Sequence, residues 1–271
     1  MHCIFCRTEA SASLSIEHII PESLGNTEHV LPAGIVCDGC NNYFASKIEQ
    51  PLLQDPYFRH QCSLAGILSK KGNLQRVRAL HPQSRTIVEL ARHLDGSGIS
   101  IGAAFESDER RWVESLQGLE SGRIYVPRPT APDPVLMARF FAKVALECLA
   151  LQCLKTGGNA EVVVFEPGLD RLRNYVRRGP PRPEWPFCSR ILYPADFAFD
   201  KAGSEPYEVL HEWSFLWVGE KLHLILALFG VEYAINLNEP NRADYDAWLS
   251  DNPGRSPLYP DGFPSDALGT R

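Results

Sequence analysis

The sequence predicts an α+β protein with a small, cross-linked N-terminal module, followed by a larger α+β domain that ends in a β-meander. Two Cys-x-x-Cys pairs lie within the first 40 residues. A long helical pattern covers 133–155, and β-rich runs separated by glycines follow near the C-terminus. We expect the module to span 1–55, the second domain 56–240, and a tail rich in Pro, Gly and Asp 241–271.

The composition is that of an ordinary globular protein. With 271 residues, of which 44% are hydrophobic and 22% charged, the chain is long enough for two domains and is neither disordered nor fibrous in character. Its longest apolar stretch, 135–154, is interrupted by Arg139, Lys143 and Glu147, which a bare membrane helix would not tolerate. The first residues also lack a signal-peptide pattern. We therefore expect a cytoplasmic protein with no membrane partner.

The net charge of −6 and the isoelectric point near 5.8 argue against a large, nonspecific phosphate-binding surface. Any binding of nucleic acid must therefore come from local basic patches.

The two cysteine pairs have the spacing of zinc knuckles. Cys3 and Cys6 form the first pair, and Cys37 and Cys40 the second. A two-residue spacing lets both thiolates of a tight turn face one tetrahedral ion, and four sulfurs leave no open coordination position. The pattern predicts a structural zinc that stabilises a segment too short to build its own core. Two unrelated pairs or a redox dithiol are the alternative, but a redox site needs one pair only.

The remaining cysteines follow no pattern, and lone cysteines usually pack as small hydrophobic side chains. They are Cys62, Cys148, Cys153 and Cys188.

Beyond a proline-bounded edge at 51–56, the sequence predicts short strands and two helices. The expected strands cover 76–80, 86–90, 99–105 and 123–127, and the meander covers 208–217, 222–229 and 233–237, with turns at Gly219 and Gly230. The expected helices are 133–155, with Pro134 in its first turn and Gly157-Gly158 after its end, and 168–178.

The segment between the knuckles reads Ile16-Glu17-His18-Ile19-Ile20-Pro21. A histidine alone in an apolar run is more often a packed core residue than a functional one. Here a carboxylate precedes His18, a helix breaker follows it, and Asn41 comes directly after the last cysteine. This context favours a catalytic histidine.

These motifs resemble the HNH endonucleases, also called ββα-metal or His-Me finger nucleases, and closely the subgroup with Cys-x-x-Cys knuckles and a Glu-His-Ile-Ile-Pro segment. The resemblance covers 1–54. It implies a strand that ends in an acidic residue and the catalytic histidine, then a loop, a second strand, and a helix that starts at the second knuckle.

The resemblance implies a role for each of three residues. His18 matches the general base, while Glu17 and Asn41 match the ligands of a catalytic divalent ion such as Mg²⁺. The chemistry is consistent, because a neutral imidazole can accept a proton from water at cellular pH. Oxygen ligands are also those that a hard cation prefers.

The sequence departs from the family at one position. Where the family has a middle Asn that holds the loop and orients the histidine, this chain has Pro32. Asn26 or a backbone carbonyl are the candidates for that orienting role.

Neighbouring polar residues have less defined roles. Glu22 and Ser23 could reach metal or phosphate through water, or could simply begin a helical turn. For His29, a solvated side chain is a simpler interpretation than a second catalytic base. Lys47 could contact phosphate, and Asn42 could take the place of its neighbour Asn41 as a metal ligand.

A basic cluster follows in the second domain. Beside Tyr175 and Trp185 it could follow a nucleic-acid backbone and offer stacking, although a solvated helix face is the simpler explanation. Its members are Arg171, Arg173, Arg177, Arg178 and Arg182. His211 and His223 fall in expected strands, where packing is a simpler explanation than ligation.

The leading hypothesis is a metal-dependent endonuclease that cuts DNA, with the resemblance implying a role in restriction or phage defence. The rivals are a zinc module that binds nucleic acid without cutting it and a platform for protein interaction. RNA as substrate, strandedness, sequence or modification specificity, and assembly as a homodimer stay open.

Overall fold

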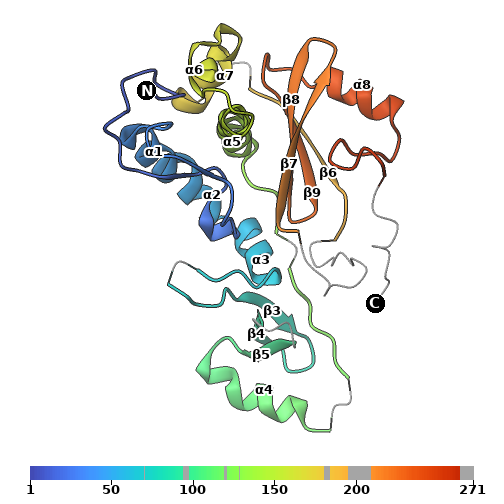
Figure 1. The fold of residues 1–271 in the computed structure, drawn as a ribbon. Helices are drawn as coiled ribbons and strands as arrows, with labels where there is room; N and C mark the ends of the chain where they lie inside the picture. The colour runs from blue at the N-terminus through green and yellow to red at the C-terminus, as the bar shows by residue number, and fades with distance from the viewer. Residues whose placement is uncertain are drawn as a thin grey trace, which may run out of the picture. The chain divides into compact units, whose positions relative to one another are not determined.

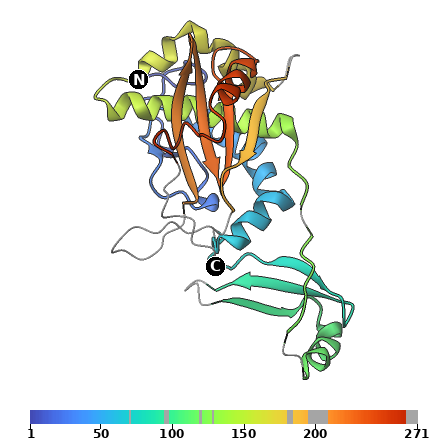
Figure 2. The same cartoon turned by 90° about the vertical axis from the view of Figure 1, so that its right-hand side faces the viewer.

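In the computed structural model, the described residues are 1–69, 71–93, 98–118, 121–127, 129–179, 184–194 and 209–262 (Figures 1 and 2). They form two compact units. The first unit combines Met1–Leu52 with Pro132–Arg271, and the second is Leu53–Ala131. The chain thus leaves the first unit close to the expected edge at 51–56, but it returns at Pro132. The division differs from the expected one because the long helix after Pro132 packs against the N-terminal module.

The N-terminal module has the expected order of strand, loop, strand and helix. Strands β1 (Glu17–His18) and β2 (Val30–Leu31) pair antiparallel, with His18 opposite Val30, and a single turn of 3-10 helix, η1 (Glu22–Leu24), lies between them. The helix begins at the second knuckle as α1 (Asp38–Phe44) and continues through a π-helical segment, η2 (Ala45–Glu49), into α2 (Gln50–Gln54).

Helix α5 (Pro134–Lys155) is the central element of the first unit. It starts where expected, because the Asp133 carboxylate accepts hydrogen bonds from the backbone N–H groups of Val135 and Leu136. It ends before Gly157, whose φ of +78° suits glycine. Most of its residues are buried, since α5 contacts β2 and η2 of the module as well as α7 and β9 (Figure 1). Even so, none of the helices in the described ranges is both long and apolar enough to traverse a bilayer.

An antiparallel sheet with strand order β6-β9-β8-β7 packs against α5. Its strands are β6 (Phe187–Ile191), β7 (His211–Val218), β8 (Lys221–Leu228) and β9 (Val231–Asn236). On one face, the Tyr233 ring lies 4.5 Å from that of Phe141 on α5. On the other face, Ile225 and Ala234 pack with Tyr245 of α8 (Ala243–Asp251). Both faces are therefore covered, which explains the continuous apolar run of β8.

The meander occurs as predicted, and its last turn requires glycine. Gly230 has a φ of +77°, and a Cβ there would lie 2.2 Å from the Tyr193 carbonyl oxygen. The prediction that 241–271 form a tail was wrong in part, because α8 lies in this range and its Tyr245 is fully buried. Alternation of acidic and aromatic residues in that helix concealed its apolar side.

The described part of the first unit also contains α6 (Glu161–Phe165) and α7 (Asp170–Arg178), the second preceded by the turn η4 (Pro167–Leu169). The predicted helix at 168–178 thus corresponds to η4 and α7.

The second unit is an antiparallel sheet with two helices. It contains α3 (Pro56–Leu64), β3 (Val77–His81), β4 (Thr86–Arg92), β5 (Ile99–Ala103), the turn η3 (Glu106–Asp108) and α4 (Glu109–Leu116). Ala79, Val88 and Trp112 form its core. The expected strand at 123–127 is reduced to one bridge between Leu80 and Tyr125.

Candidate functional site

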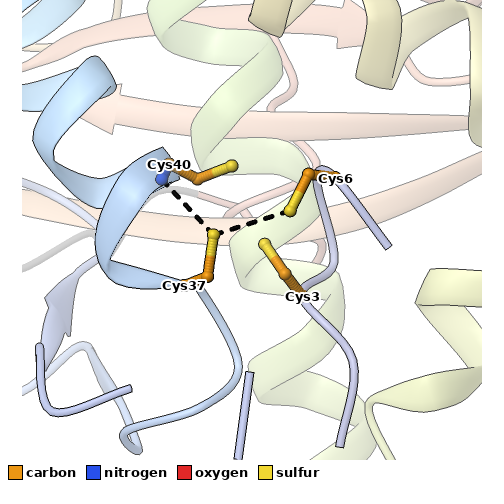
Figure 3. A group of neighbouring side chains, drawn as sticks. All are labelled: Cys3, Cys6, Cys37 and Cys40. Carbon is orange, nitrogen blue, oxygen red and sulfur yellow. Dashed lines mark hydrogen bonds between the residues drawn. The ribbon is translucent and has the colours of Figure 1, made fainter. Parts of the chain in front are cut away.

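The four knuckle cysteines converge on one point (Figure 3). Their sulfur atoms all lie within 4.8 Å of one another, and those of Cys6 and Cys37 are 3.5 Å apart. Cys37 caps the first turn of α1, where its sulfur accepts a hydrogen bond from the Cys40 backbone N–H at 3.4 Å. Helix α1 and the N-terminal turn therefore present two sulfurs each to a shared centre.

This arrangement fits a tetrahedral zinc ion. With Zn–S distances of about 2.3 Å, tetrahedral sulfurs lie roughly 3.8 Å apart, which is compatible with the observed cluster. A hydrogen bond with Cys40 already lowers the pKa of Cys3 to about 4. The same bond, together with burial, raises the pKa of Cys40. Without a cation, therefore, the four thiols do not all ionise together. A divalent cation at their centre would stabilise four thiolates at once.

The first knuckle is anchored to α7 by Arg173. This side chain is only 4% exposed, and its Nε donates to the Ile4 carbonyl oxygen at 2.7 Å. It also donates to the Val163 carbonyl oxygen and pairs with Asp170. The expectation that Arg173 contacts nucleic acid does not fit this position, because its guanidinium is already committed to the protein's own backbone.

His18 ends β1 and is half-buried. Its Nδ1 is buried and has no hydrogen-bond partner among the described residues. Since side chains alternate along a strand, His18 and Glu17 point to opposite sides of β1. The two residues of the Glu-His pair therefore meet different surroundings.

Asn41 lies next to the same strand. From the first turns of α1, its Nδ2 donates to the Ile16 carbonyl oxygen at 3.4 Å. The structure thus brings Asn41 to the residue that precedes the Glu-His pair. With Nδ2 used in this way, the amide oxygen is left as the atom that a cation would use.

Glu17 is 4% exposed and faces α5. Its Oε1 accepts a hydrogen bond from Lys143 Nζ at 2.6 Å. The same ammonium lies 2.8 Å from Glu49 Oε1 on η2 and 2.9 Å from Glu147 Oε2 on α5. One fully buried lysine therefore joins three carboxyl groups, from β1, η2 and α5.

Burial and charge oppose each other in this Lys143 cluster. Burial raises the pKa of Glu17, although the Lys143 charge acts to lower it. Burial likewise raises the pKa of Glu147 well above its usual value. Burial acts to lower the pKa of Lys143, but the charges of Glu147, Glu17 and Glu49 outweigh it, and that pKa is raised. Lys143 is therefore a cation, and its charge offsets part of the cost of burying the Glu17 and Glu147 carboxylates.

Asn26 organises the loop between β1 and β2. It is fully buried, and its Nδ2 donates to the carbonyl oxygens of Ile20 at 2.7 Å and His29 at 2.9 Å. Its Oδ1 accepts from the N–H groups of Glu28 and His29. One amide thus closes the loop that follows His18, whereas Pro32 is exposed after β2.

The less defined residues lie around this loop. Glu22 and Ser23 form η1, as in the interpretation that they begin a helical turn. His29 is half-buried beside β2 and is not the solvated side chain that we expected. Lys47 and Asn42 are exposed on the helix that starts at α1.

The basic cluster is only partly at the surface. Arg171 and Arg178 are exposed and Arg177 is half-buried, while Arg182 lies outside the described residues. Tyr175 and Trp185 are both buried, with ring centroids 5.6 Å apart, so the suggestion that they stack on bases does not fit their positions.

Comparison with known families identifies the class of the module. Residues 3–56 match the model of the HNH endonuclease family. The match and the cysteine cluster, which is placed to hold a metal such as zinc, together fit an HNH module of the kind with zinc knuckles in the N-terminal segment. Proteins with this domain are in general nucleases. No match was found among curated proteins or solved structures.

Sequence reasoning did not find the partners of Glu17. Lys143 and Glu147 were recognised only as interruptions of an apolar stretch. The available signal was their four-residue spacing on the buried side of a helix, where two unpaired charges would be costly.

Proposed function

We propose that the protein is a metal-dependent endonuclease that hydrolyses phosphodiester bonds of DNA, with His18 as the general base. The observation that carries the proposal is the HNH family match over 3–56, which includes His18 between two cysteine pairs that converge on one centre.

The imidazole of His18 takes a proton from the attacking water. The water oxygen then bonds to phosphorus, and the bond from phosphorus to the 3′ oxygen breaks. Because Nδ1 is buried, Nε2 is the nitrogen that we assign to this transfer, with the resting proton on Nδ1. Asn26 supports the base by fixing the loop that pairs with its strand.

Asn41 and Glu17 are the proposed ligands of a divalent cation. Such an ion, when bound, supplies positive charge that offsets the negative charge developing on the phosphate. Asn41 offers its amide oxygen. Glu17 would use a carboxylate that already contacts the Lys143 ammonium. That ammonium repels a second cation, and the carboxylates of Glu49 and Glu147 reduce the repulsion.

The test is a cleavage screen of single- and double-stranded DNA and RNA with Mg²⁺, Mn²⁺ or Ni²⁺, comparing wild type with His18→Ala. We expect at least about 10²-fold slower cleavage by the variant, with zinc content and melting temperature unchanged. A packed core histidine would instead leave a cavity and lower stability. A destabilised variant that cuts at the wild-type rate would overturn the mechanism. Mild EDTA treatment should stop cleavage without removing zinc.

Exposed Lys47, Arg171 and Arg178 are candidates for phosphate contacts, with Arg177 beside them. A cytoplasmic location fits the paired thiols, which a reducing compartment keeps available for metal. The role in restriction or phage defence follows from the resemblance, and a homodimer would supply the second cut of a double-strand break. RNA cleavage in the screen would redirect the substrate assignment.

A further inference from the structure

A cavity of about 650 Å³ lies in the first unit, between the β1–β2 loop, the last turns of α5 and the edge strand β7. Its size falls within the range of ligand-binding clefts, roughly 300–1,000 Å³. The family match ends before α5 and β7, so nothing in the match accounts for this cavity.

One wall of the cavity is a row of aromatic side chains. Strand β7 alternates its side chains, so that His211, Trp213, Phe215 and Trp217 share one face. Pairing with Leu224 and Leu226 places that row on the α5 side of the sheet. Trp217 is 64% exposed although it is large and apolar, and the Trp213 and Phe215 rings lie 5.7 Å apart. Such a row offers several π faces, the form that platforms for base stacking take.

The cavity also holds polar atoms without partners. Trp213 Nε1 and His29 Nδ1 are buried and have no hydrogen-bond partner within the described part of the chain. An indole N–H can only donate, so its partner must offer an acceptor. Leaving such groups unpaired costs free energy, and a ligand with hydrogen-bonding edges would remove that cost.

The charges at the cavity suit a nucleotide, with an uncharged base inside the cavity and a phosphate beside Lys155. They do not suit a free anion deep inside the cavity. Burial, aided by the charge of Lys155, lowers the pKa of His29, and burial also lowers the pKa of His211. Both imidazoles are therefore neutral near pH 7. The Glu212 side chain points to the opposite face, where it accepts hydrogen bonds from Tyr193 and Tyr259. Lys155 is exposed at the cavity and provides a cation for phosphate.

The cavity is joined to the proposed catalytic strand. The His29 carbonyl oxygen accepts a hydrogen bond from the N–H of Ile19, the residue after His18, at 3.0 Å. Asn26 holds His29 on both its N–H and its carbonyl oxygen. A ligand seated against His29 is therefore held against the same hairpin that carries His18.

From these observations we infer that the cavity binds one unstacked nucleobase of the polynucleotide substrate. The base stacks on a neighbouring ring of this aromatic row, its edge accepts a hydrogen bond from the in-plane indole N–H of Trp213, and Lys155 contacts a neighbouring phosphate. The inference rests on the proposed function for its substrate, and it identifies β7 and α5 as a substrate-recognition element outside the HNH module.

The test measures how the full chain binds fluorescent single-stranded oligonucleotides in EDTA, where cleavage does not interfere. One base at a time is replaced by an abasic site. Wild type should lose about 10-fold in affinity at one position, the effect of removing a single stacked base. In Trp213→Ala the intact oligonucleotide should bind correspondingly more weakly, and the abasic penalty should vanish. Gln152→Trp, which fills the cavity from an exposed helix position, should have the same effect without removing a wall residue.

Phe165→Ala is the matched control, because Phe165 is an exposed aromatic residue of the same unit that does not line the cavity. It should keep the full abasic penalty. Three outcomes would overturn the inference. Every abasic oligonucleotide could bind with equal affinity, the abasic penalty could persist in both cavity variants, or the protein could bind no oligonucleotide. Competition by a mononucleotide as strong as that of the oligonucleotide would also overturn it, since the ligand would then be a free nucleotide.

Cleavage assays run in parallel separate the two proposals. If DNA is cleaved but no abasic site weakens binding, only the proposal of a base-binding cavity is refuted. If an abasic site weakens binding but no metal supports cleavage, only the nuclease proposal is refuted.

Discussion

Replacing Lys143 by methionine should destabilise the first unit by about 3–5 kcal/mol, the cost of removing one partner from a buried ion pair. The Lys143 side chain is fully buried, and its ammonium is the shared partner of Glu17, Glu49 and Glu147. Methionine preserves much of the volume but leaves these carboxyl groups without a cation. The melting temperature, measured by circular dichroism, should fall by roughly 6–20 °C.

The loss should depend on pH in a defined direction. Folding raises the pKa of Glu17 and Glu147, so the folded protein binds protons that the unfolded chain has released. Stability from these groups is therefore present at acid pH and falls as the pH rises through their folded-state values. Without Lys143 those values rise further. The difference from wild type should be largest near pH 8 and smaller near pH 5. The raised pKa of Lys143 keeps its own contribution constant across this window.

Two variants control the measurement. Lys155→Met alters an exposed lysine of the same helix and should change stability little. The double variant Lys143→Met/Glu147→Met replaces a buried pair by apolar side chains and should recover part of the loss. A single variant as stable as wild type at pH 8, or a difference that grows toward acid pH, would refute this account of the Lys143 cluster.

Elemental analysis should find one zinc per chain, lost in Cys37→Ser, where hydrogen exchange should show α1 losing protection before β8 and β9. A folded, unoxidised protein without zinc would contradict the four-cysteine assignment. Asn26→Ala should cost at least about 1–3 kcal/mol, because it leaves buried backbone groups unpaired, and should slow cleavage; an unchanged melting temperature would remove its loop-closing role. Glu17→Gln should raise the Mg²⁺ concentration for half-maximal cleavage by at least about 10-fold, while Glu49→Gln, which also alters a Lys143 partner, should not. Equal effects of the two substitutions would assign Glu17 to the buried cluster and not to metal binding.

The features that the sequence predicted correctly are those fixed by interactions between residues close together in the chain. The Cys-x-x-Cys spacing anticipated a four-sulfur centre because two residues between cysteines confine both sulfurs to one turn. The run at 133–155 anticipated α5 because the Asp133 cap, the proline in the first turn and the glycines after the end act within a few residues. The meander followed for the same reason, with glycines at its turns.

The surroundings of the functional residues could not be predicted from such patterns. Whether a charged side chain faces water or the core depends on which helix packs over it, and that partner is distant in sequence. Arg173 belonged to an arginine-rich helix, and only packing against the first knuckle turned it inward.

Sequence patterns were enough to predict the four-cysteine centre, the order of elements in the N-terminal module and the candidate set of His18, Glu17 and Asn41. Two features became visible only in the folded chain: Glu17 pairs with Lys143, 126 residues away in sequence, and His29 and β7 form two walls of one cavity. The reason is that hydrogen bonds of turns and caps are fixed by neighbours in sequence, whereas burial and ion pairing depend on which segments the hydrophobic core brings together.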